Sequence, residues 1–311
     1  MTANAEGGPS SAGGQPFLRV GHGTYELRTE DARAAAHPSR SSRGERRSAK
    51  ESVVATRVDA LIEGFPRYLR VYDEQYPFRR SGQWSNHAAT IQLRRALGSA
   101  TAAARDASFV ANLHQTLRSW GIGKRASRIV SVEMFTQALE THVRDLQQLE
   151  GLSIEDSRID IDGVVEILWR FIETAPVVEN RAKIVAGTKT LHHLLPDLVP
   201  PIDREWTGAF FDWTLNDFQS GQRRTFLEGF TTLHSVAVAT RPSQYVGDGW
   251  RTSSSKLLDN ALIGYMLDER SSIARAPSPV DIGMLSTAEL EDLRDLIQQE
   301  LSTRPDRDQP E

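Results

Sequence analysis

The chain of 311 residues contains no cysteine, and this absence removes several kinds of chemistry. Without a thiol there is no disulfide, no thiolate nucleophile and no iron–sulfur cluster. The chain also has no run of about 18 apolar residues, the length that a membrane-spanning helix needs. Its N-terminus lacks the basic stretch followed by an apolar one that marks a secretory signal. We therefore expect a cytoplasmic protein with no membrane partner.

Familiar nucleotide-binding and hydrolase motifs are missing as well. The sequence has no P-loop, no G-x-S-x-G elbow and no dinucleotide-binding fingerprint. Its histidines lack a metal-binding spacing such as H-E-x-x-H, and the adjacent His192 and His193 would point about 100° apart on a helix. We expect no cofactor and no metal cluster, and the oligomeric state is left open.

The formal net charge is −4, which does not by itself favour a nucleic-acid binder. The basic residues are nevertheless clustered. Residues 33–50 contain six basic side chains and a single acidic one, Glu45, and residues 118–128 contain four basic side chains and no acidic one. Such patches are compatible with DNA binding, but a solvated charged surface is the preferred interpretation of any single patch.

The pattern of apolar residues predicts an all-α protein. Residues 1–16 are of low complexity, residues 17–29 form either a short strand or an extended segment, and residues 30–51 read as a polar linker with a basic arm. Beyond Ser52, apolar side chains recur at three- and four-residue intervals. We predict a disordered segment over 1–51, a single multi-helix domain over 52–302 and a disordered tail over 303–311.

One stretch, VAGTKTLHHLLPDLVPPIDREW (residues 185–206), holds the most informative polar residues. On a helical wheel its leucines form one stripe, and Lys189, His192 and His193 lie on the opposite side. That polar side is either a solvent-exposed face or part of a functional site. Asp203 follows a proline turn and precedes the next helix, where a carboxylate serves as an N-cap. The same carboxylate can also act on a substrate if the cap borders a cleft.

The order of these residues resembles the signature of the helix-hairpin-helix DNA glycosylase superfamily, in particular its 8-oxoguanine glycosylase-like branch. The matching letters are GTK, a helix, and then VPPID followed by a tryptophan, with Gly187 as the one glycine of the hairpin. The segment LHHLLPDLVPPIDR is also similar to stretches of uncharacterised actinobacterial proteins. The resemblance implies an all-α fold with a helix-hairpin-helix-like element and DNA as the partner.

The same resemblance implies an activity and two catalytic residues. A DNA glycosylase extracts a damaged or modified base from the stack and cleaves its N-glycosidic bond, in repair or in defence against phage DNA with modified bases. Asp203 matches the aspartate that stabilises the positive charge on the sugar, and Lys189 matches the lysine that attacks C1′ in members that also have lyase activity. His192, His193 and Arg204 then become candidates for contacting phosphate or base.

Two other segments supply candidate DNA-binding residues, each with a structural alternative. Trp84, Asn86 and His87 stand at the start of a predicted helix, where they either stack on and read a base or cap the helix. The segment LRSWGIGKRASR places Lys124 and Arg125 after two glycines, which suggests a phosphate-binding turn or simply a turn that ends a helix.

Lys256 is the last candidate. It lies one helical turn from Asp259 and Asn260, so these side chains either join the site or pair with one another. The alternative to an enzyme is a non-catalytic all-α module that binds DNA or protein, in which Lys189 lies on a helix face and Asp203 is a cap.

Overall fold

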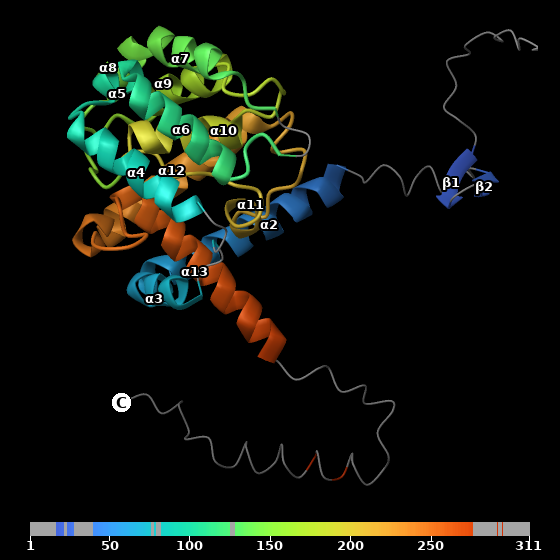
Figure 1. Ribbon diagram of the computed structural model, residues 1–311. Coiled ribbons are helices and arrows are strands. Elements are labelled where there is room, and N and C mark those ends of the chain that lie inside the picture. Colours follow the sequence, from blue (N-terminus) through green and yellow to red (C-terminus); the bar gives the residue numbers. More distant parts are fainter. Residues whose placement is uncertain are drawn as a thin grey trace, which may run out of the picture. The chain divides into compact units, whose positions relative to one another are not determined.

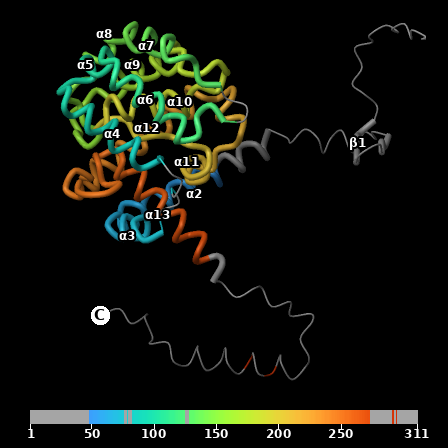
Figure 2. Tube along the Cα trace, viewed as in Figure 1, coloured from blue at the N-terminus to red at the C-terminus, as the bar shows by residue number. Residues whose placement is uncertain are grey.

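The structure is a computed structural model that describes residues 17–21, 24–27, 40–75, 78, 82–124, 128–275, 291 and 294. The chain forms two compact units, residues 1–60 and 61–311, and each is described by itself. Figures 1 and 2 trace the helices and strands along the chain. The expectation of disorder over 1–16, 28–39 and 303–311 falls outside the described residues.

The first unit contains a β-hairpin and most of a long helix. Strands β1 (Phe17–Gly21) and β2 (Thr24–Leu27) are antiparallel, with Phe17 opposite Leu27. For residues 17–29 the sequence predicted either a short strand or an extended segment, and the structure has strands here. Helix α2 spans Arg40–Glu63, so residues 40–51, which were expected to belong to a disordered arm, are helical, and the helix begins well before Ser52.

In the second unit, the regular elements that the structure describes are helices, and the prediction of an all-α domain is confirmed. Their bounds follow in chain order: α3 (Phe65–Gln75), α4 (Gln83–Ala96), α5 (Ala100–Arg105), α6 (Ala107–Ser119), α7 (Val132–Thr141), α8 (Val143–Leu149), α9 (Ile161–Thr174), α10 (Ile184–Leu194), α11 (Thr207–Phe210), α12 (Gln222–Thr240), the 3₁₀ helix η1 (Pro242–Tyr245) and α13 (Ser254–Arg275). None of the described helices is both long enough and apolar enough to cross a membrane.

Helix α9 shows how the sequence builds this domain. Its N-cap is Asp160, whose carboxylate accepts the backbone N–H of Gly163 at 3.2 Å. Its apolar positions recur with helical spacing and are buried: Val164, Val165, Leu168, Trp169, Phe171 and Ile172. Burying such a stripe removes apolar surface from water, which is the main favourable contribution to folding.

Helix α10, which carries Lys189, is buried on nearly every side. It packs against α9, α6, α4 and α5, and even its polar residues Thr188, Thr190, His192 and His193 are buried. The helical wheel predicted that the leucine face lies against the core and that the polar face is either exposed to solvent or part of a functional site. The opposite face instead meets further helices of the same domain, so its polar groups must find partners inside the protein.

Helices α3 and α13 approach each other unusually closely, and they lie side by side in Figure 1. Gly264 of α13 makes this possible, since a Cβ atom there would lie 1.9 Å from the carbonyl oxygen of Tyr68. The contact fixes the part of α13 that carries Lys256 and Asp259 in the domain.

Candidate functional site

Two adjoining hollows form the candidate site. The inner pocket has a volume of about 30 Å³, enough for one or two water molecules, and lies among α10, α13 and the segment that precedes α11. The outer cleft is larger, about 660 Å³. The two hollows share five lining residues, which are Phe78, Gln83, Trp120, Lys189 and Asp203.

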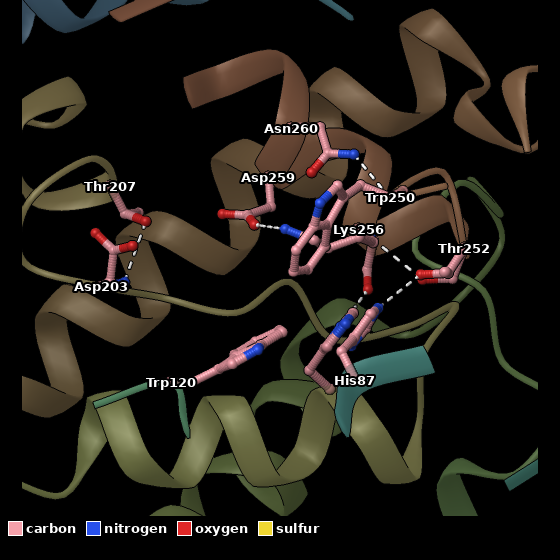
Figure 3. Close-up of polar contacts among 12 residues, drawn as sticks. His87, Trp120, Asp203, Thr207, Trp250, Thr252, Lys256, Asp259 and Asn260 are labelled. Carbon is pink, nitrogen blue, oxygen red and sulfur yellow. Dashed lines mark hydrogen bonds and ion pairs between the residues drawn. The ribbon is translucent and has the colours of Figure 1, made fainter. Parts of the chain in front are cut away.

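Lys189 and Asp203 therefore border the same space, as the sequence motif suggested. The Asp203 side chain also bonds the turn that leads into α11, because its Oδ1 accepts the backbone N–H of Trp206 at 2.7 Å. Its own N–H donates to the Thr207 hydroxyl at 3.2 Å (Figure 3), and Trp206 is the N-cap residue of α11. Asp203 thus lines the cleft and bonds the turn before α11, but the prediction that it is the N-cap of the next helix is wrong, because that position belongs to Trp206.

The environment of Lys189 shifts its side chain toward the neutral amine. Its Nζ lies 5.6 Å from the centre of the Trp120 ring and 3.4 Å from the Trp120 carbonyl oxygen. Burial lowers the pKa of Lys189 below its usual value; the carboxylates of Asp203 and Asp259 oppose this shift, and the ammonium of Lys256 adds to it. An amine with a lowered pKa is a better nucleophile near neutral pH than an ordinary surface lysine.

Lys256 and Asp259 form a second lysine–aspartate pair at the inner pocket (Figure 3). Their Nζ and Oδ2 atoms are 2.5 Å apart, and their side chains are only 1% and 7% exposed. Burial raises the pKa of Asp259, and the nearby Lys256 opposes that rise. Lys256 therefore pairs with Asp259, as one sequence-based alternative predicted, and it also lines the inner pocket.

Aromatic rings surround the ammonium of Lys256. The ring centroids of Tyr72, Phe78, Trp120 and Trp250 lie between 5.1 and 5.7 Å from its Nζ. Such cation–π contacts offset part of the cost of burying a charge. Asn260, the other residue of this group, bonds the Trp250 carbonyl oxygen at 2.8 Å and holds one of these rings in place.

A chain of buried hydrogen bonds ends at the backbone of Lys189. The Lys189 carbonyl can only accept, so His193 donates to it from Nδ1 at 2.8 Å, and the Nε2 of a neutral His193 accepts from His87 Nδ1 at 3.0 Å. His87 Nε2 then accepts the Thr252 hydroxyl at 3.0 Å. Burial lowers the pKa of His193 to about 4 and that of His87 well below its usual value.

The three histidines proposed as substrate contacts are buried in the interior of the domain. His87, His192 and His193 are fully buried, and His192 bonds the Val199 carbonyl and the Ser255 hydroxyl, each at 3.0 Å. None of the three lines the inner pocket or the outer cleft. The sequence could not reveal this, because one helix considered alone does not show which neighbours cover its polar face.

Two other predicted DNA-binding residues lie at the outer cleft. Arg204 and Lys124 are exposed and line it, and the Arg204 guanidinium stands 5.7 Å from the Phe218 ring. Gly121 and Gly123 both have φ near +88°, which supports the sequence-based alternative of a glycine-dependent turn. Arg125 falls outside the described residues.

Trp84 and Asn86 do not line either hollow. The Trp84 side chain is 38% exposed and packs on Trp250 with ring centroids 5.0 Å apart. Asn86 lies in the first turn of α4, whose N-cap is Gly82. Trp84 thus contacts the inner pocket only indirectly, by packing on Trp250, which lines it.

Gly187 plays a different role from the one the motif implied. Helix α10 begins at Ile184, so the letters GTK lie inside the helix rather than before it. A Cβ atom on Gly187 would lie 2.9 Å from Ile172 Cγ1 of α9, so this glycine permits a close helix–helix contact. The connection that joins α9 to α10, residues 175–183, contains no glycine.

Sequence reasoning missed several residues of the site: Phe78, Gln83, Trp120 and Trp250. They come from segments far apart in the chain, and only Trp120 carried a local signal, since it immediately precedes the two glycines of a basic turn. The described residues contain no group of three or more metal-ligating side chains that could hold a metal ion. No family model, curated protein or solved structure matches the chain.

Proposed function

We propose that this protein is a DNA glycosylase that cleaves the N-glycosidic bond of a damaged or modified base. The observation that carries the proposal is that Lys189 and Asp203, which belong to different elements, line the same two adjoining hollows. A nucleophilic amine and a carboxylate that stabilises positive charge on a sugar are the two groups that this cleavage uses. The resemblance of the surrounding sequence to the helix-hairpin-helix glycosylases points the same way.

The outer cleft suits an extruded nucleotide. Its volume of about 660 Å³ lies within the range of about 300–1,000 Å³ that is common for small-molecule sites. Trp120 and Phe78 offer aromatic faces on which a base can stack. Arg204 and Lys124 provide exposed positive charge for the flanking phosphates.

The proposed reaction follows from this arrangement. Nζ of the neutral Lys189 forms a bond to C1′ while the bond between C1′ and the base nitrogen breaks, and its electron pair leaves with the base. The base takes up a proton, and the amine gives one up to solvent. Asp203 stabilises the positive charge that develops on the sugar as the old bond breaks before the new one is complete.

The test is release of a base from DNA. We would incubate the full chain with single- and double-stranded oligonucleotides that each carry one damaged or modified base, and then measure abasic sites. Lys189→Gln and Asp203→Asn should each slow base release by about 100-fold or more. Lys183→Gln is a matched control, because Lys183 lies about 1.7 helical turns before Lys189 and its Nζ bonds the Glu173 carbonyl.

Two results would contradict the proposal. Full base release by Asp203→Asn would show that the carboxylate has no part in the chemistry. Tight DNA binding without loss of any base from a broad panel would favour the non-catalytic binding module instead. Repair and defence against phage DNA use the same reaction, so the identity of the released base is what separates them.

A further inference from the structure

The ammonium of Lys256 has hydrogen-bonding capacity that the protein does not use. It carries three N–H donors, and among the described residues its one hydrogen bond is to Asp259. It is only 1% exposed, so bulk water does not satisfy the other two donors. The four aromatic rings around it interact with its charge but accept no ordinary hydrogen bond. A buried charge with unused donors is costly unless ordered water in the inner pocket, or a ligand that displaces this water, accepts from them.

The position of Lys256 indicates which ligand that would be. It lines the inner pocket together with Lys189 and Asp203, which also line the outer cleft. If C1′ of the substrate lies at Lys189 and Asp203, the edge of the base farthest from the sugar reaches toward the inner pocket. Trp120 borders both hollows and can stack on that base along its length.

We infer that Lys256 is a base-recognition residue, whose ammonium donates a hydrogen bond to a keto oxygen of the base while Asp259 accepts the neighbouring ring N–H. This inference rests on the proposed function and adds a substrate class to it: bases with a lactam edge, such as those of the guanine, hypoxanthine and uracil type. At the same ring position adenine and cytosine carry an amino group, to which an ammonium cannot donate, and the neighbouring ring nitrogen has no N–H for Asp259 to accept.

The same contact assists departure of the base. When the N-glycosidic bond breaks, the electron pair enters the base, and part of the negative charge gathers on the keto oxygen. A hydrogen bond from an ammonium strengthens as that charge grows, so Lys256 binds the departing base more tightly than the intact nucleotide. Asp259 fixes the direction of the ammonium and acts through Lys256 as a positioning residue as well as an acceptor.

The experiment measures binding of free bases, which requires no cleavage. Hypoxanthine and uracil are the keto probes, and adenine and cytosine are their amino counterparts; the readout is quenching of tryptophan fluorescence, because Trp120 and Trp250 both lie beside Lys256. The variant is Lys256→Met with Asp259→Asn, which removes both charges at once so that no unpaired charge stays buried. Lys183→Gln serves as the matched lysine control, and thermal melting verifies that each variant is folded.

The wild-type protein and the Lys183→Gln control should bind each keto base at least tenfold more tightly than its amino counterpart. The double variant should lose this preference while it stays folded. The inference is overturned if the folded double variant keeps the preference, or if the wild-type protein shows none. Because the readout is binding, failure here is distinguishable from failure of the proposed cleavage, which the abasic-site assay reports.

Discussion

Mild acid should destabilise this domain because its buried histidines are neutral in the folded state. His193 is fully buried, and its pKa is lowered to about 4 from an unfolded value of 6.5. The pKa values of His87 and His192 are lowered well below 6.5, also mainly by burial. Each unfolded histidine therefore takes up a proton at a pH where its folded counterpart does not.

The sign and size of the effect follow from linkage. A group whose pKa is lower in the folded state contributes stability that is complete above the unfolded pKa and is lost as the pH falls from 6.5 toward the folded pKa. For His193 the loss reaches about 3 kcal/mol, at about 1.4 kcal/mol per pH unit for each proton. Domains of this kind have only about 5–15 kcal/mol of total stability, so the change should be large.

The assay is urea unfolding at half-unit steps between pH 7 and pH 4.5, a window in which most carboxyl groups stay ionised. The free energy of unfolding should fall steadily below pH 6.5. The His193→Gln variant should lose about 1.4 kcal/mol per pH unit from the slope in the lower part of the window. A wild-type free energy that stays constant across this window would refute the conclusion that these imidazoles are buried and neutral.

Two further predictions concern helix α13. Lys256→Met and Asp259→Asn should each lower the free energy of unfolding by about 3–5 kcal/mol. In urea unfolding, the double variant should lose much less than the sum of these two values. Strictly additive losses would mean that the two side chains do not interact. Gly264→Ala should lower the free energy of unfolding by about 1–3 kcal/mol or more, because the new Cβ would overlap the Tyr68 carbonyl. Gly247→Ala should leave the melting temperature nearly unchanged, because a Cβ there would have no atom within 4 Å. Equal melting temperatures for these two alanine variants would contradict the close packing of α3 and α13.

The sequence predicted those features that depend on residues close together in the chain. Helical spacing of apolar residues predicted the all-α domain. The Asp203 carboxylate accepts a backbone N–H just ahead of α11, close to the capping role that its position suggested. That Lys189 and Asp203 line the same hollows could be anticipated, because a single proline-containing connection leads from the end of α10 to Asp203. The early start of α2 was missed, because residues 40–51 contain few apolar side chains to mark a helix.

The rest of the site depends on contacts between distant segments. His87 and His193 are 106 positions apart, yet their rings share a hydrogen bond, and no periodicity within either helix reveals that partner. The same holds for Trp120 and Trp250, which come together around Lys256. The reason that His192 and His193 are buried is likewise tertiary, since several helices enclose α10.

The most direct test of the proposed chemistry is to identify the lysine that bonds to DNA. The full chain would react in the presence of borohydride with an oligonucleotide from which it releases a base. Opening of the sugar ring converts the C1′ adduct into a Schiff base, as the ring oxygen takes its electron pair and a proton, and borohydride reduces this Schiff base to a stable amine. Trypsin digestion with mass spectrometry would then locate the adduct. A modified Lys189 resists trypsin, so the adduct should appear on the peptide that spans residues 184–204, and Lys189→Gln should form no adduct. An adduct on Lys183 or Lys256, or one that persists in Lys189→Gln, would contradict the assignment of Lys189 as the nucleophile.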